Sequence, residues 1–109
     1  MKILAMEKEI PGARAGQFES YRKEEARRVW ALYKQGIVRE MHFRQDRHEA
    51  ILLFECADPG EARRVLDTLP LVEKGPIDFD IIPLVPYPGF ERLFETDPSA
   101  AKRECIPPG

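Results

Sequence analysis

Three side chains with acid–base and anion-binding chemistry, Glu40, His42 and Arg44, stand two residues apart in the sequence. Alternate residues of a β-strand point to the same face, so this spacing places a carboxylate, an imidazole and a guanidinium together. Glu55 ends a later apolar segment and would lie beside them in an antiparallel pair. Such a set could shift a proton next to a carbonyl while an arginine holds a carboxylate. The candidate catalytic residues are therefore Glu40, His42 and Glu55.

A solvated strand with cross-strand ion pairs would show the same triplet, and such pairs are common on exposed sheet faces. A metal site is not expected, because His48 falls in a polar turn and has no fixed geometry relative to His42. The cysteines, Cys56 and Cys105, form no CxxC motif. Without a secretion signal we expect both to be free thiols.

Four residues are candidates for substrate binding: Arg44 and Arg39, Trp30 and Tyr87. Arg39 falls in the apolar phase of its strand and could extend along a strand end or enter a pocket beneath the helices. Trp30 suits the helix-to-sheet core, with ligand contact as the alternative. Tyr87 lies in a proline-stiffened link, which favours an interface first and a pocket second.

The spacing of apolar residues in the segments that carry these candidates predicts an α+β fold. Helical spacing of apolar residues predicts one helix over 17–35 and a second from Asp58 to near Pro70, with Pro59 at its first position. Strands are predicted at 2–9, 37–44, 50–56 and 77–83. The β-α-β-β-α-β order is the ferredoxin-like arrangement, a four-stranded antiparallel sheet with two helices on one face.

The two faces of this sheet differ in composition. The alternation of side chains along each predicted strand places one set under the helices: Met41, Phe43, Leu52, Phe54, Phe79 and Ile81. The open face receives aliphatic, acidic and basic residues together: Val38, Glu40, His42, Arg44, Ile51, Leu53, Glu55, Asp78, Asp80 and Ile82. This mixture predicts that the open face packs against a second copy, sheet to sheet, with the acids of 77–83 paired to that copy.

Bulk properties exclude several classes of function. The chain of 109 residues carries a net charge of −2, which does not favour nucleic-acid binding. No apolar run is long enough to span a membrane, and the N-terminus does not resemble a secretory signal. We therefore expect a cytoplasmic protein with one domain over 1–94 and a poorly ordered tail over 95–109.

Several segments resemble the muconolactone delta-isomerase-like family of dimeric α+β barrels. They are GIVRE (36–40), TLPLV (68–72), IDFDIIPL (77–84) and YPGF (87–90). The resemblance spans about 2–94. It implies a homodimer or larger ring, a small-molecule pocket, and no metal or organic cofactor. The enzymes of this family shift a proton on an unsaturated lactone that carries a carboxylate. VEKGP (72–76) departs from their aromatic continuation, which bears on the substrate rather than the fold.

We expect a cofactor-independent isomerase acting on a small carbonyl or lactone. The alternatives are a non-catalytic small-molecule-binding or accessory protein, and a barrel-type monooxygenase. An enzyme should hold Glu40, His42 or Glu55 beside an enclosed cavity, with a shifted pKa. If these groups are paired and exposed, the site should be sought on the helix side, near Arg39 and Trp30.

Overall fold

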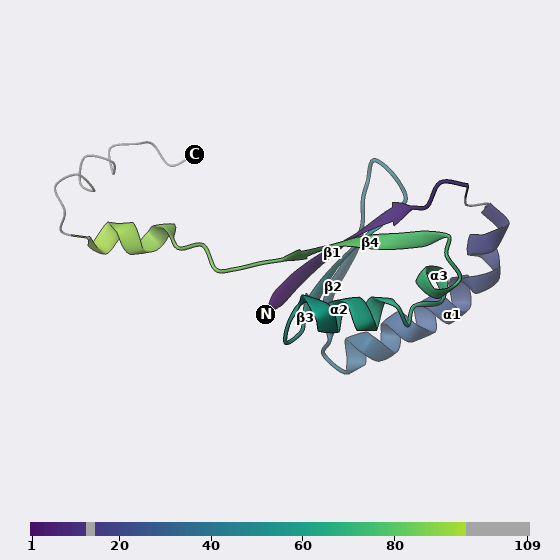
Figure 1. The fold of residues 1–109 in the computed structure, drawn as a ribbon, viewed down its shortest axis with the longest axis horizontal. Coiled ribbons are helices and arrows are strands. Elements are labelled where there is room, and N and C mark those ends of the chain that lie inside the picture. Colours follow the sequence, from purple (N-terminus) through teal and green to yellow (C-terminus); the bar gives the residue numbers. More distant parts are fainter. Residues whose placement is uncertain (13–14, 96–109) are drawn as a thin grey trace.

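The computed structural model describes residues 1–12 and 15–95. The elements follow the predicted order, with two short helices added (Figure 1). They are β1 (Lys2–Glu9), α1 (Ala15–Lys34), β2 (Val38–Phe43), β3 (Ala50–Glu55), α2 (Pro59–Leu66), α3 (Pro70–Glu73), β4 (Ile77–Pro83) and the 3₁₀ helix η1 (Gly89–Phe94). Residues 96–109, which include Cys105 and almost all of the expected tail, lie outside the described part.

The sheet has the strand order β2-β3-β1-β4, and every neighbouring pair is antiparallel. All three helices of the body lie on one side of it (Figure 1). The predicted α+β fold with a β-α-β-β-α-β order is confirmed. The opposite side of the sheet is bare in the single chain.

The core lies between the sheet and the helices. Its buried side chains come from alternate strand positions and from one side of the helices and their connections, as amphipathic elements require. They include Ile3, Ala5, Leu52, Phe54, Phe79, Leu32, Ala62, Leu66, Leu69 and Leu71. Burying each large aliphatic or aromatic side chain contributes roughly 1.5–3 kcal/mol, so this layer is the main source of stability.

The second helix is shorter than its pattern predicts, because Pro70 interrupts it. A residue that precedes proline avoids the helical conformation, and Leu69 is extended with φ −72° and ψ 130°. α2 therefore ends at Leu66, and Pro70 starts the separate turn α3. This break places the backbone N–H of Leu71 where it can face α1.

A β-bulge in β2 corrects the predicted face of Val38. Val38 pairs with Phe54 whereas Glu40 pairs with Leu53, so the register shifts by one residue at Arg39. Val38 therefore points to the helix side and is only 1% exposed, although simple alternation places it on the open face. After the bulge the predicted phase holds: Glu40 lies on the open face and Met41 on the helix side.

The chain beyond β4 forms an arm that extends away from the body (Figure 1). Leu84 donates a backbone hydrogen bond to Lys2 at 2.9 Å, and η1 lies at the far end of the arm. The apolar side chains of the arm are exposed. Phe94 is 83% exposed, and the others include Val85, Tyr87, Phe90 and Leu93. Within the described residues no helix has the length and apolar character needed to cross a membrane.

Candidate functional site

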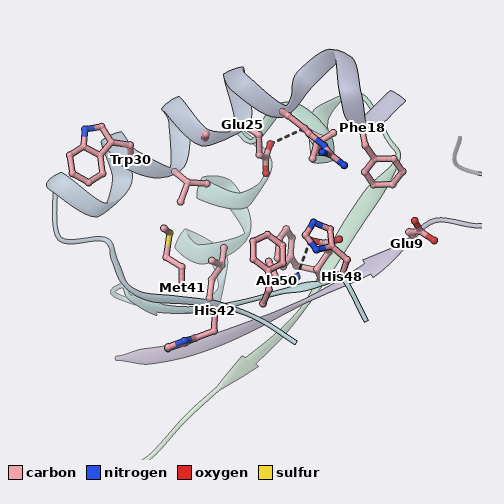
Figure 2. Close-up of a pocket in the computed structure, with 16 residues that line it drawn as sticks. Glu9, Phe18, Glu25, Trp30, Met41, His42, His48 and Ala50 are labelled. Atoms are coloured by element: carbon pink, nitrogen blue, oxygen red, sulfur yellow. Dashed lines mark hydrogen bonds between the residues drawn. The ribbon is translucent and has the colours of Figure 1, made fainter. Parts of the chain in front are cut away.

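A cavity of about 880 Å³ lies between α1 and the sheet (Figure 2). It exists because the helices leave the hairpin end of β2 uncovered. Met41 and Phe43 point to the helix side, as predicted, yet they remain 46% and 61% exposed. Their side chains form part of the cavity wall instead of the closed core.

Most of the cavity wall is apolar. The apolar lining residues come from α1, α3, β2, β3 and β4: Phe18, Ala26, Val29, Trp30, Met41, Phe43, Ala50, Leu52, Leu71 and Phe79. Six titratable or charged residues also line the cavity: Glu7, Glu9, Arg22, Glu25, His42 and His48. An apolar cleft with a few polar groups is the usual form of a small-molecule site.

Glu25 is the half-buried carboxylate that α1 contributes to the cavity (Figure 2). Its Oε1 accepts a hydrogen bond from the backbone N–H of Leu71 in α3, at 3.0 Å. Burial raises the pKa of Glu25, and the nearby carboxylate of Glu7 raises it further, while the Leu71 bond opposes both. A carboxyl group with a raised pKa in an apolar cleft is suited to exchange protons with a ligand.

Glu7 is the second half-buried carboxylate, on the helix side of β1 opposite Phe79. Its Oε1 accepts a hydrogen bond from the backbone N–H of Ala50 at 3.1 Å. Burial raises the pKa of Glu7, and Glu49 adds to the rise, while the Ala50 bond and His48 lower it. Both acids are thus held through one oxygen by a backbone donor.

The remaining polar groups are more exposed. His48 stacks on Phe43, with ring centroids 4.5 Å apart and planes 3° from parallel. Arg22 forms an exposed ion pair with Glu19, three residues earlier in α1, at 3.5 Å.

The three predicted catalytic residues lie on the open side of the sheet. His42 Nε2 and Glu40 Oε1 are 3.3 Å apart, and both side chains are exposed. Figure 2 shows the His42 ring on the far side of the sheet from α1. Glu55 Oε2 accepts a hydrogen bond from the Met1 amino group at 2.6 Å, and this bond lowers the pKa of Glu55. The catalytic assignment stays a prediction, while the paired and exposed arrangement directs attention to the helix side.

The predicted substrate-binding residues are separated in the chain. Arg39 donates from Nε to the carbonyl of Gly36 at 2.6 Å, and Arg44 is paired with Asp46 and Glu49 in the hairpin. Tyr87 packs edge-on against Phe90 in the arm.

Of the four, Trp30 alone lines the cavity, 58% exposed and stacked on Tyr33.

The acids of β4 also differ from expectation. Asp80 accepts a hydrogen bond from Lys8 of β1 at 2.7 Å, and Asp78 from Arg63 of α2 at 2.9 Å. Both partners belong to the same chain, whereas the composition of the open face predicts partners in a second copy.

Sequence reasoning missed Glu7 and Glu25. Glu7 carried a usable signal, because it falls in phase with Ile3 and Ala5 on the core side of β1. Glu25 carried a similar signal within the run KEEARR (23–28), because it stands four residues from both Tyr21 and Val29 in the apolar stripe of α1, whereas its exposed neighbour Glu24 does not. In the described part of the chain, no three His, Cys, Asp or Glu side chains form a group able to hold a metal ion.

Comparison with known proteins agrees with this fold. A family model described as muconolactone delta-isomerase matches residues 3–89. No curated protein matches the chain. A solved structure of 5-chloro-2-hydroxyhydroquinone dehydrochlorinase from Burkholderia phenoliruptrix AC1100, in complex with 2,5-dihydroxybenzoquinone, is similar with a TM-score of 0.57. It is 14% identical, and the match covers 78% of this chain and 94% of that one.

At that identity the structural match supports the fold alone. The family model, by contrast, spans well over half of the 109 residues and covers the strands and helices of the body from Ile3 onward. The chain belongs to the muconolactone delta-isomerase family.

Proposed function

We propose that this protein is a cofactor-independent isomerase that shifts a proton on a small carbonyl or lactone compound in the cavity beneath α1. The observation that carries the proposal is the Glu25 carboxylate, half-buried in an apolar wall, fixed by Leu71 and raised in pKa. Membership of the muconolactone delta-isomerase family supports the same reaction class.

Glu25 is the proposed base. An isomerase must remove a proton from a carbon next to a carbonyl and return it at another carbon. Because Leu71 binds one carboxylate oxygen, the other oxygen is available to the ligand. Burial disfavours the charged form of Glu25, which makes the carboxylate a stronger base than a solvated one.

Glu7 is the proposed second acid–base group. It lines the same cavity from the sheet side and is influenced electrostatically by His48. A protonated Glu7 could donate to the carbonyl oxygen on which charge develops during enolisation. Two carboxyl groups on opposite walls give the base and the proton donor that the reaction needs.

A non-catalytic binding function is the second candidate. Two observations favour it: Glu40 pairs with His42 and Glu55 pairs with the N-terminus, and all three predicted catalytic residues are exposed. The cavity would then hold a small molecule without changing it. The apolar wall would also suit a barrel-type monooxygenase, the third candidate.

We further propose that the working form is a homodimer or a larger homo-oligomer. The open sheet face carries Leu4, Met6, Ile51, Leu53 and Ile82 in register with one another. The exposed aromatic residues of the arm have no partner surface within the described chain (Figure 1). A second copy would cover both regions and remove this apolar surface from water.

Hydrogen–deuterium exchange tests the proposed reaction directly. The full-length protein is incubated in D₂O with a panel of unsaturated γ-lactones and enones, and proton NMR follows exchange next to the carbonyl and migration of the double bond. Isomerisation with deuterium incorporation is the expected result. Ligand binding without exchange would favour the binding function, and oxygen consumption with a hydroxylated aromatic compound would favour the monooxygenase.

A further inference from the structure

We infer that His48 donates a hydrogen bond to the carbonyl oxygen of a ligand held in the cavity beneath α1. The inference rests on the proposed function, which places a carbonyl or lactone compound in this cavity, and it adds the residue that binds the reacting oxygen. The chain has two histidines, His42 and His48. Figure 2 shows His48 on the same side of the sheet as α1 and His42 on the far side, so His48 is the one whose ring faces the cavity.

The ring of His48 is held in a fixed plane at the rim of the cavity. It lies parallel to the ring of Phe43, with the centroids 4.5 Å apart and the planes 3° from parallel. Phe43 is the last residue of β2 and pairs with Ala50 of β3, so the hairpin folds His48 back over the end of the strand. The stack occupies one face of the imidazole, whereas both ring nitrogens lie at its edge. It therefore orients the ring and leaves the nitrogens available.

The turn that carries His48 is braced without the imidazole. The backbone N–H of Arg44 donates to the carbonyl of Glu49 at 2.9 Å, and the N–H of Glu49 donates to the carbonyl of Arg47 at 2.8 Å. The guanidinium of Arg44 also binds Asp46 at 2.6 Å. These contacts fix the backbone on both sides of His48, so its side chain is not needed to close the turn.

Neither ring nitrogen of His48 has a hydrogen-bond or ion-pair partner among residues 1–12 and 15–95. By contrast, Nε2 of His42 lies 3.3 Å from Glu40. A neutral imidazole carries one N–H in either tautomer and a charged imidazole carries two, so His48 offers a donor in every protonation state. An unused donor on the wall of an apolar cleft is the kind of group that orients a bound small molecule.

Glu7 places a second polar group on the same wall. Its Oε1 accepts from the backbone N–H of Ala50, two residues after His48. Burial is the main influence on the pKa of Glu7 and raises it, and His48 is near enough to lower it electrostatically. His48 and a protonated Glu7 are thus neighbouring donors on the sheet side of the cavity. Two donors to one carbonyl oxygen stabilise the negative charge that develops there when a base removes the adjacent proton.

This arrangement defines how a lactone would lie. Glu25 reaches the cavity from α1, opposite the wall that carries His48 (Figure 2). The carbonyl oxygen would therefore point to the sheet side, and the carbon that loses its proton would face Glu25.

Two ring compounds of the same shape provide the test. Phthalide is a benzo-fused γ-lactone with no proton on the carbon next to its carbonyl, so it cannot isomerise, and phthalan is the same bicycle without the carbonyl oxygen. Titration calorimetry on the full-length protein measures both affinities. His48→Phe keeps a planar ring over Phe43 and removes the nitrogens. We expect it to weaken phthalide binding about two- to tenfold, as the loss of one hydrogen bond requires, and to leave phthalan binding unchanged.

Arg47→Gln is the matched control, because Arg47 precedes His48 in the same turn and its side chain is exposed and paired with Glu49. It should change neither affinity more than about twofold. An equal loss for both compounds in His48→Phe would assign a role in shape rather than hydrogen bonding and would overturn the inference. A comparable loss in Arg47→Gln, or no binding of phthalide to the parent protein, would overturn it as well.

The imidazole nitrogens give a second readout that needs no change in the site. A ¹⁵N-labelled chain has two histidines to observe, and the spectrum of His42→Gln assigns them if His48→Phe fails to fold. Phthalide should shift the nitrogen signals of His48 and leave those of His42 in place. Signals of His48 that do not respond to bound phthalide would contradict the proposed contact.

The deuterium exchange assay separates this inference from the proposed function. A response of His48 to phthalide without isomerisation of any unsaturated lactone would leave the contact standing and remove the catalytic role. Isomerisation by a protein whose His48 signals do not respond to bound phthalide would preserve the catalytic role and remove the contact.

Discussion

Glu25 of α1 accepts a hydrogen bond from the backbone N–H of Leu71 at 3.0 Å, which ties the long helix to the single turn α3. Pro70 makes the bond available, because it ends the run of α2 and opens a new helix whose first N–H groups have no partner within the helix. The same carboxylate forms part of the cavity wall. Glu25 thus takes part both in the contact between α1 and α3 and in the lining of the cavity.

Replacing this carboxylate should separate catalysis from folding. Glu25→Gln keeps an oxygen that can accept from Leu71 but removes the base, so we expect a loss of about 10²–10⁴ in kcat for isomerisation. Ligand affinity should change far less. The matched control is Glu24→Gln, since Glu24 is exposed and paired with Arg27. Equal activity in both variants would contradict the assignment of Glu25.

The residues of the open face should matter less for turnover. Glu40→Gln, His42→Ala and Glu55→Gln each alter an exposed pair, and we expect kcat/KM within about threefold of the parent protein, consistent with the small free energies of such pairs. Steady-state kinetics on the lactone identified by NMR would measure this. A hundredfold loss of kcat/KM in any one variant would support the catalytic assignment of Glu40, His42 and Glu55 instead.

The sequence predicts the sheet, its two main helices and their order. Hydrophobic periodicity indicates the type of each element, and Gly and Pro residues indicate where the elements end. The predicted face of Val38 is wrong, because a β-bulge adds one residue to β2 and the hydrophobic pattern does not indicate a bulge. Helical phase places Glu25, and not Glu24, on the apolar side of α1, but the hydrogen bond from Leu71 depends on where α3 lies and is not predicted. Tertiary contacts decide such cases, and the candidate site depends on them more than the fold does.

The half-buried acids should make stability depend on pH. Burial raises the pKa of Glu7 and of Glu25 above the ordinary value of 4.5, so the folded chain binds their protons more strongly than the unfolded chain. Their contribution to stability is greatest below pH 4.5 and is lost as pH rises through the folded pKa values. Urea unfolding of the parent and of Glu25→Gln between pH 4 and 7 should show Glu25→Gln gaining relative stability with rising pH.

The start of α2 offers a test of stability away from the cavity. Asp58 accepts from the backbone N–H of Glu61 at 2.8 Å, and the Glu61 side chain accepts from the N–H of Ala57 at 3.1 Å. The side-chain cap by Asp58 predicts a loss of about 0.5–2 kcal/mol in the free energy of unfolding for Asp58→Ala. Asp58→Asn should lose only a small part of that. An unchanged urea midpoint in Asp58→Ala would show that the cap does not contribute.

The arm provides the test of assembly. Phe90 and Phe94 are 67% and 83% exposed on η1, at the far end of the arm. If a second copy buries them, the double change Phe90→Ser and Phe94→Ser should lower the mass measured by light scattering toward that of a single chain. Arg92→Gln, on the same turn, removes a charge without removing apolar surface and should keep the parent mass. The reason is energetic: two buried phenylalanines contribute roughly 3–6 kcal/mol to an interface, whereas an exposed charge contributes about 1 kcal/mol or less. An unchanged mass in the double variant would place the interface on the open sheet face alone.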